Sequence, residues 1–351
     1  MAPGAAQAAT KTVSMGVPPK SAGGFEQVGT EVNAFFPTSI AVHTGDSVSF
    51  APAGFHTVHF PKSGKFTPLQ IPGTTAVSGL VDAAGTPFWF NGLTPPQFNP
   101  AVFGANLFGK AVTASKTKEI ISGPTPDVPE GQTPKPLRVK FTKTGLYRYI
   151  CDLHPGMKGS VRVVAKRARV ASKAQDAARV KQQISDALAI AKNLPKTAVP
   201  ANSVLVGPQG KKGVHLFGFL PGNLTVPTGT TVTFRMAPNS SEIHTAAFGP
   251  GADTFGLETP PDPNSYLGQL LAGFQSQAGD PRVDFSSEAP GTPTAVLTPT
   301  LHGNGFWSTG IMDGIAASPP PGSGQLTFGT AGVYPYVCLV HPFMKGTITV
   351  T

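Results

Sequence analysis

No apolar run in the 351 residues approaches the 18 residues that a membrane span needs, so no transmembrane segment is expected. Charged residues make up only 13% of the chain while 40% is hydrophobic, which excludes a disordered chain. Glycine and proline are plentiful instead, with 41 and 37 residues. Such frequent turn residues are typical of many short strands. Because domains average about 150 residues, we expect two domains, both all-β.

The sequence lacks any recognised nucleic-acid motif, although its net charge is +9. Residues 158–196 hold ten Lys and Arg against two Asp and carry +8 of that charge, which leaves 17 basic and 16 acidic residues elsewhere. A basic stripe can attract phosphates or an acidic protein, but a solvated connector is the simpler interpretation. We therefore predict no nucleic-acid partner.

The amino terminus also lacks the charged start and apolar core of a secretory signal. Its small residues resemble the end of such a signal, since Ala6-Gln7-Ala8 is like a cleavage site. We interpret the chain as a mature exported protein (periplasmic, cell-surface or secreted) with an added initiator Met.

The chain repeats itself. Residues 36–50 read FPTSIAVHTGDSVSF and residues 220–234 read LPGNLTVPTGTTVTF. Apolar alternation on both sides of a Thr-Gly turn is typical of half-buried strands in a hairpin. A second pair of blocks, FTKTGLYRYICDLHPGMKG at 141–159 and FGTAGVYPYVCLVHPFMKG at 328–346, ends the two halves. Two copies of one β-domain explain both matches.

These matches predict the domain boundaries. The first domain covers residues 1–166 and contains a long insertion at about 61–135. The second covers residues 199–351 and contains an insertion at about 249–322. Both insertions are rich in Pro and Gly, without sustained periodicity. Residues 167–198 between the domains form a basic linker.

That linker contains the one helix that the sequence predicts. Ser172 followed by Gln175 is a capping box. Apolar residues then recur at helical spacing, and Asn193 and Pro195 supply the stop signal. We expect a helix of about 20 residues, roughly 30 Å long.

Both cysteines of the chain lie in the same motif, Cys-x-x-His-x-x-Met. This spacing lets one short loop turn a thiolate, an imidazole and a thioether toward a single point. Soft sulfur with imidazole selects copper or zinc, and a trigonal His₂Cys set with a weak axial Met is the blue-copper arrangement. The two motifs are Cys151, His154 and Met157, and Cys338, His341 and Met344.

Each site then needs a second histidine from elsewhere in its domain. His56 follows the first matched hairpin in FHTVHF, and His244 follows the second in IHTAAF. Aligning the two His-Thr pairs places His59 opposite Ala247. A ligand that both copies require should occur in both, so His56 is a better candidate than His59.

With these residues both halves resemble cupredoxins, the blue-copper family of plastocyanin, azurin and amicyanin, and the ligand loops are most similar to those of amicyanin. The resemblance covers about residues 30–60, 137–164, 214–248 and 324–351. It implies an eight-stranded Greek-key β-sandwich in each half, with a type 1 copper ion at one end. The implied ligands are His56, Cys151, His154 and Met157 for one copper, and His244, Cys338, His341 and Met344 for the other. Thr57 and Thr245 depart from the family, which usually has Asn there to tie the ligand loops together.

Electron transfer between redox partner proteins is the function that this site predicts, because no general base stands beside the ligands. The sequence does not identify those partners or an oligomeric state. One alternative is a two-domain copper oxidase or nitrite reductase with a further inter-subunit copper. Such enzymes commonly use His-x-His pairs and a His beside the blue-copper Cys, and neither pattern occurs here. Copper storage or delivery would use the same ligands and is the other alternative.

Neither a disulfide nor the remaining histidines change this interpretation. A bond between Cys151 and Cys338 is not expected, because disulfides need Cα atoms within about 7 Å and these cysteines occupy equivalent positions of two separate domains. Structural or surface roles are expected for the other histidines in the matched halves, which are His43, His59, His215 and His302.

Overall fold

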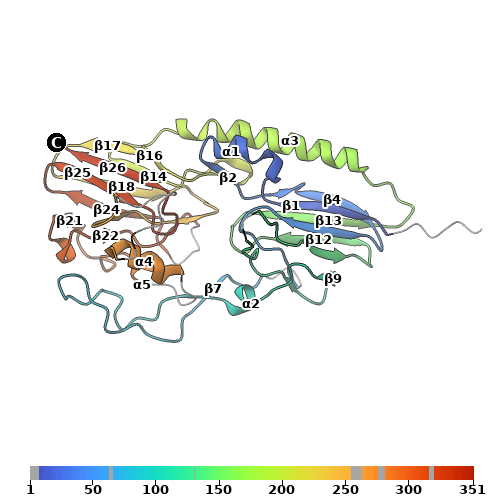
Figure 1. The fold of residues 1–351 in the computed structure, drawn as a ribbon, viewed down its shortest axis with the longest axis horizontal. Coiled ribbons are helices and arrows are strands. Elements are labelled where there is room, and N and C mark those ends of the chain that lie inside the picture. The colour runs from blue at the N-terminus through green and yellow to red at the C-terminus, as the bar shows by residue number, and fades with distance from the viewer. Residues whose placement is uncertain are drawn as a thin grey trace, which may run out of the picture. The chain divides into compact units, whose positions relative to one another are not determined.

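The computed structural model describes residues 8–62, 66–129, 131–253, 262, 264–275, 281–315 and 320–351. Its chain divides into two compact units (Figure 1). Unit 1 contains Met1–Gln70, Phe98–Lys192 and Gly210–Val214, and unit 2 contains Ile71–Gln97, Asn193–Gln209 and His215–Thr351. Ala6 and Gln7 of the cleavage-like site, and parts of both insertions, lie outside the described residues.

Unit 1 contains two five-stranded sheets. The strands of the first sheet, in spatial order, are β3 (Phe35–Phe36), β1 (Thr10–Met15), β5 (Ser47–Pro52), β11 (Leu137–Lys140) and β9 (Ala111–Thr113). Those of the second are β10 (Ile120–Ile121), β6 (His59–Phe60), β12 (Gly145–Ile150), β13 (Lys158–Val164) and β4 (Ser39–His43).

Unit 2 also contains two five-stranded sheets, and their strand orders correspond one for one with those of unit 1. The first sheet consists of β16 (Phe219–Leu220), β14 (Ser203–Val206), β18 (Thr230–Met236), β24 (Ser323–Phe328) and β21 (Val296–Leu297). The second consists of β22 (Trp307–Ser308), β20 (Ala247–Phe248), β25 (Gly332–Val337), β26 (Lys345–Val350) and β17 (Asn223–Val226). Short strands beside these sheets are β2 (Thr30–Val32), β7 (Gln70–Ile71), β8 (Gln97–Phe98), β15 (Val214–Leu216), β19 (Ile243–His244) and β23 (Met312–Asp313).

Within each unit the two sheets share one buried core. The rings of Phe50 on β5 and Tyr149 on β12 have centroids 5.0 Å apart. Their counterparts Phe234 on β18 and Tyr336 on β25 lie 5.3 Å apart. The all-β class is therefore confirmed. The two main sheets of each unit hold ten strands where the resemblance implied eight, because two-residue strands extend the sheet edges.

The strands expected at 36–50 and 220–234 exist, but the hairpin pairing expected between them is wrong. β4 and β5 belong to different sheets of unit 1, as β17 and β18 do in unit 2. The turn after β4 is fixed by Asp46, whose carboxylate accepts hydrogen bonds from the amides of His43 (2.9 Å) and Ala9 (2.8 Å). It passes the chain from one sheet to the other, so both strands present their apolar side chains to the same core.

The helix expected between the two halves is confirmed as α3 (Lys173–Ala191), and its capping box between Ser172 and Gln175 is formed. The helix lies on unit 1. The side chain of Gln183 donates to the carbonyl of Phe35 at 2.9 Å. The buried Asp176 accepts from Lys11 Nζ at 2.6 Å. These polar contacts attach α3 to the first sheet of unit 1. None of the helices in the described part has the length and apolarity of a membrane span.

The second insertion also contains α4 (Tyr266–Gln275), which the sequence analysis did not expect. Glycine weakens helix propensity, and Gly268 lies in its first turn. Tertiary packing offsets this cost, because Leu267 and Leu270 are fully buried in a second core of unit 2. The remaining short helices are α1 (Gly23–Glu26), α2 (Pro100–Phe103) and α5 (Pro281–Asp284).

Part of the first insertion, residues 71–97, belongs to unit 2. Phe88 and Phe90 are buried in the same core as α4. Next to this core the imidazole of His302 lies between two carboxylates, with Nδ1 3.2 Å from Asp82 Oδ2 and Nε2 2.8 Å from Glu288 Oε1. The hydrogen bond to Glu288 raises the pKa of His302 against the opposing effect of burial, and Asp82 raises it further. A protonated His302 therefore ties residues 71–97 to the rest of unit 2.

This tie predicts a pH-dependent stability of unit 2. The folded pKa of His302 exceeds the usual value of about 6.5. The stabilisation of unit 2 by protonated His302 is therefore complete below pH 6.5 and is lost as the pH rises through the folded pKa. When the pH is raised from 6 to 9, we expect the urea midpoint of the wild type to decrease by more than that of His302→Gln. Tryptophan fluorescence reports on this unit, since both tryptophans, Trp89 and Trp307, lie in it. Equal pH responses would contradict the prediction.

Candidate metal centres

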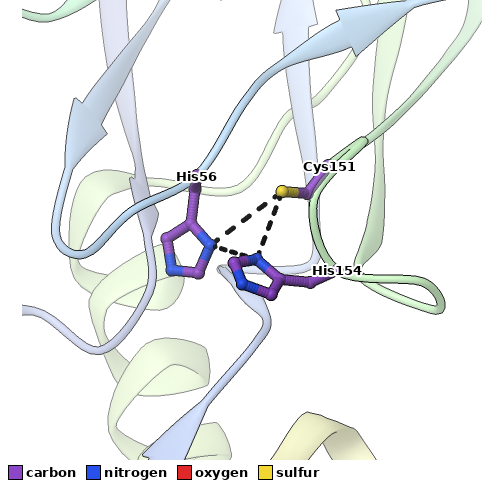
Figure 2. A group of neighbouring side chains, drawn as sticks. All are labelled: His56, Cys151 and His154. Atoms are coloured by element: carbon purple, nitrogen blue, oxygen red, sulfur yellow. Dashed lines mark hydrogen bonds between the residues drawn. The ribbon is translucent and has the colours of Figure 1, made fainter. Parts of the chain in front are cut away.

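In unit 1 a thiol and two imidazoles converge on one point (Figure 2). The Nδ1 atoms of His56 and His154 are 2.9 Å apart, and they lie 4.0 Å and 3.4 Å from the Sγ atom of Cys151. All three side chains are buried, with exposed fractions of 0%, 7% and 2% for His56, His154 and Cys151. The three donors therefore face one another away from water.

Two loops at one end of unit 1 supply these donors. His56 follows β5, and Cys151 directly follows β12. The loop between β12 and β13 is closed by two backbone hydrogen bonds, from Met157 N to His154 O (3.0 Å) and from Cys151 N to Met157 O (2.9 Å). The spacing of Cys-x-x-His-x-x-Met thus fits one tight turn. Met157 is 2% exposed and belongs to the same core cluster as Cys151.

Unit 2 repeats this geometry. The Sγ atom of Cys338 lies 3.7 Å from His244 Nδ1 and 3.8 Å from His341 Nδ1, and the two nitrogens are 3.1 Å apart. The loop is closed by bonds from Met344 N to His341 O (2.9 Å) and from Cys338 N to Met344 O (3.1 Å). Met344 is buried in the same core cluster as Cys338. The structure therefore brings the predicted histidine and cysteine ligands together in two equivalent clusters, with a buried methionine in each loop.

The donor sets fit a metal ion of copper type. Donors that bind one ion at about 2.0–2.3 Å cannot lie more than about 4.6 Å from one another. The observed separations are 2.9–4.0 Å in unit 1 and 3.1–3.8 Å in unit 2. One thiolate with two imidazoles favours copper or zinc over the hard cations magnesium and calcium.

The two thiols differ in their acidity. Burial opposes ionisation of Cys151, but the charges and hydrogen bonds of His154 and His56 lower its pKa well below the ordinary value. Burial raises the pKa of Cys338, and backbone hydrogen bonds from Thr245 and His341 only partly oppose it. A bound cation would deprotonate either thiol outright.

In each unit a threonine side chain connects the two ligand loops by a hydrogen bond. Thr57 Oγ1 accepts a hydrogen bond from the amide of Asp152 at 2.7 Å, and Thr245 Oγ1 accepts one from the amide of Leu339 at 2.7 Å. The amides of the same threonines donate to the cysteine sulfurs at 3.3 Å in each unit. Threonine therefore forms a loop tie at the position where the resembling family usually has asparagine.

Sequence analysis missed the residues that face the outer nitrogens of His56 and His244. In unit 2 the Nε2 atoms of His215 and His244 are 2.8 Å apart and their rings are stacked. In unit 1 a carboxylate oxygen of Glu31 lies 3.8 Å from His56 Nε2. These partners differ between the two copies, so matching the repeats could not reveal them.

Two glycines, also missed, make room for the outer edges of these imidazoles. Gly16 follows β1, and Gly207 follows the equivalent strand β14. Both have positive φ, +100° and +59°. A Cβ atom on Gly207 would lie 2.3 Å from His244 Nε2, and one on Gly16 would lie 3.0 Å from His56 Nε2. The sequence signal that could have identified them is a glycine directly after each of two equivalent apolar strands.

We expect Gly207→Ala to displace His244 and to remove metal binding from unit 2 while leaving unit 1 loaded. The left-handed backbone costs a non-glycine residue about 1–2 kcal/mol, and the contact with His244 adds to that cost. Gly229→Ala is the matched control, because Gly229 has φ +84° in the same unit with nothing within 4 Å of its Cβ position. Metal counting on both variants tests this. Full loading of Gly207→Ala, or an equal loss in the control, would contradict it.

The other histidines lie outside the two clusters. His59 is fully buried, with Nδ1 2.6 Å from Asp152 Oδ1 and Nε2 2.6 Å from Glu119 Oε1. Both its ring nitrogens are therefore occupied by carboxylates. Although burial lowers the pKa of His59, the two carboxylates raise it above the ordinary value overall. His43 lies 2.8 Å from the carbonyl of Ala168 in unit 1.

No protein-family model matches the chain, and no curated protein matches it. Among solved structures it is similar to amicyanin from Paracoccus versutus, with 20% identity over 44% of this chain and 85% of amicyanin, at a TM-score of 0.23. It is also similar to oxidised plastocyanin from Dryopteris crassirhizoma, with 19% identity over 42% of this chain and 99% of plastocyanin, at a TM-score of 0.21. The geometry of the two clusters is therefore the basis for inferring a function.

Proposed function

We propose that this chain is an electron-transfer protein that binds two type 1 copper ions, one in each unit. The first ion is bound by His56, Cys151, His154 and Met157, and the second by His244, Cys338, His341 and Met344. The observation that carries the proposal is the occurrence of two separate, largely buried His₂Cys clusters with the same loop closure and a methionine in each loop. This donor set is that of blue-copper electron-transfer sites.

The protein's own residues prepare each cluster for one-electron exchange. The thiolate and the imidazoles are supplied by loops whose backbone hydrogen bonds and threonine ties fix them before an ion arrives. Burial excludes water from the donors of unit 1 and from His244 and Cys338, while His341 is partly exposed. When bound, copper supplies the Cu(II)/Cu(I) couple, and the fixed donors limit the rearrangement that accompanies each electron.

The proposal extends to the organisation and setting of the chain. The two halves are tandem cupredoxin domains, residues 1–166 and 199–351, joined by the basic linker 167–198. The matching strand orders of the two units support this arrangement. The protein works outside the cytoplasm, and its partners are proteins that donate or accept single electrons.

Copper loading tests the proposed function. We expect two Cu(II) ions per chain, an intense visible thiolate-to-copper band, a type 1 EPR signal and reversible one-electron reduction. A colourless Cu(II) protein with an ordinary EPR signal would contradict the proposal. Steady-state reduction of oxygen or nitrite at tens per second, an ordinary enzymatic rate, would favour the enzyme alternative. Copper release on reduction in place of a reversible potential would favour a delivery protein.

A further inference from the structure

The two clusters have the same ligands but different charges around them. We infer that the two copper sites have unequal reduction potentials, with the site in unit 1 lower than the site in unit 2. The inference rests on the proposed function. It follows from three differences between equivalent positions of the two units.

The first difference is at the outer nitrogen of the upstream histidine. Metal binding at Nδ1 leaves Nε2 of His56 and His244 to carry a proton. In unit 1 that proton lies near the carboxylate of Glu31, 3.8 Å away. In unit 2 it would be donated to the buried imidazole of His215, whose Nε2 atom lies 2.8 Å away. A carboxylate increases the basicity of a ligating histidine, and so stabilises the more positive oxidised ion.

The second difference is a buried charged cluster beside Cys151. His59 lies between the carboxylates of Asp152 and Glu119, at 2.6 Å from each. Because both ring nitrogens face acceptors, both must donate, so His59 is an imidazolium. One positive and two negative charges leave a net charge of −1 next to the first site.

Unit 2 has no charged residue at the two positions equivalent to His59 and Asp152. Strand pairing sets the equivalence, because His59 pairs with Ile150 on β12 as Ala247 pairs with Val337 on β25. Asp152 is two residues beyond Ile150, and Leu339 is two residues beyond Val337. Ala247 and Leu339 are both fully buried. Negative charge in a weakly screened interior stabilises Cu(II) relative to Cu(I), so unit 1 has the lower potential.

The third difference is the hydroxyl next to each sulfur. Thr57 Oγ1 donates to Asp152 Oδ2 at 2.9 Å, whereas its distance to Cys151 Sγ is 3.8 Å. Asp152 therefore withdraws this donor from the sulfur. At the equivalent position of unit 2, Leu339 offers no carboxylate to compete for the hydroxyl of Thr245. Hydrogen bonds to the copper-binding sulfur tune the potential, and a donor on the thiolate favours the reduced ion.

The potentials are measured on copper-loaded single-site variants. Cys338→Ala reports on the first site alone and Cys151→Ala on the second. A one-electron mediator supplies the electron that converts Cu(II) to Cu(I), and the blue band is followed against the applied potential. We expect the reduction potential of the first site to be lower than that of the second by at least about 59 mV. For a one-electron couple this corresponds to a tenfold difference in the Cu(I)/Cu(II) ratio at one applied potential. A smaller difference or the reverse order would overturn the inference. A wild-type protein without blue bands would instead contradict the proposed function.

Two changes to unit 1 identify the source of the difference. In the Cys338→Ala background, Glu31→Gln removes a charge from a side chain that is 36% exposed, so the fold should tolerate it. The double change His59→Ala with Asp152→Leu installs the residues of unit 2. Each should raise the potential of the first site, while Glu26→Gln, at an exposed position on α1, should leave it unchanged. If the double variant does not fold, Glu31→Gln remains a test. An unchanged potential in Glu31→Gln, or an equal rise in Glu26→Gln, would overturn the role of local charge.

Discussion

Replacing Cys151 with alanine is expected to reduce the bound copper from two ions per chain to one and to remove roughly half of the blue absorbance. Cys338→Ala should do the same through the other site. The reason is that each thiolate is the one sulfur anion of its cluster and the source of the charge-transfer band. The double variant should be colourless and should hold no type 1 copper.

Each single variant is the control for the other, since the two cysteines lie in different units. Metal analysis, the visible spectrum and EPR are measured on the same samples, and circular dichroism verifies the fold. A single variant that loses all colour while remaining folded would mean that the chain has one site. A double variant that stays blue would mean that neither cysteine is a ligand.

His59→Ala is expected to destabilise unit 1 strongly, although His59 is not a ligand. The change leaves the carboxylates of Asp152 and Glu119 without the imidazolium that lies between them. Removing one partner from a buried charged group costs about 3–5 kcal/mol. Since the folded pKa of His59 is raised, the full effect should appear below pH 6.5 and should shrink as the pH rises through that folded pKa. Urea unfolding at pH 6, followed by hydrogen exchange of peptides from β6 and β12, measures this change.

A second substitution should restore most of the lost stability. Asp152→Leu in the His59→Ala background gives unit 1 the apolar pair found at Ala247 and Leu339, and replacing buried ionic groups with apolar ones is often neutral. Glu119 is 30% exposed and can turn toward water. His43→Ala is the matched control, with an expected cost of about 1 kcal/mol for the hydrogen bond to Ala168 and the contact with Asp46 at a partly exposed site. If His59→Ala cost no more than His43→Ala, the buried charged cluster would be contradicted.

The strands and ligand loops could be predicted from the sequence because their signals are local. Alternation located β4, β5, β17 and β18, and the capping box at Ser172 located the start of α3. The two Cys-x-x-His-x-x-Met loops close on themselves through short backbone hydrogen bonds, so spacing alone indicated which donors converge. Comparing the two halves then distinguished His56 from His59, and the structure places only His56 in the cluster.

Tertiary structure alone decided what depends on residues far apart in the chain. The hairpin expected at Thr44–Gly45 became a crossing between sheets, because either pairing satisfies the same alternating pattern. The contact of Asp152 with His59 spans 93 residues, and that of His215 with His244 spans 29. Such contacts leave no periodicity or spacing in the sequence. The sequence by itself determined two copies of one ligand set, and the fold decided which charges surround each copy, because burial brings together side chains that chain order keeps apart.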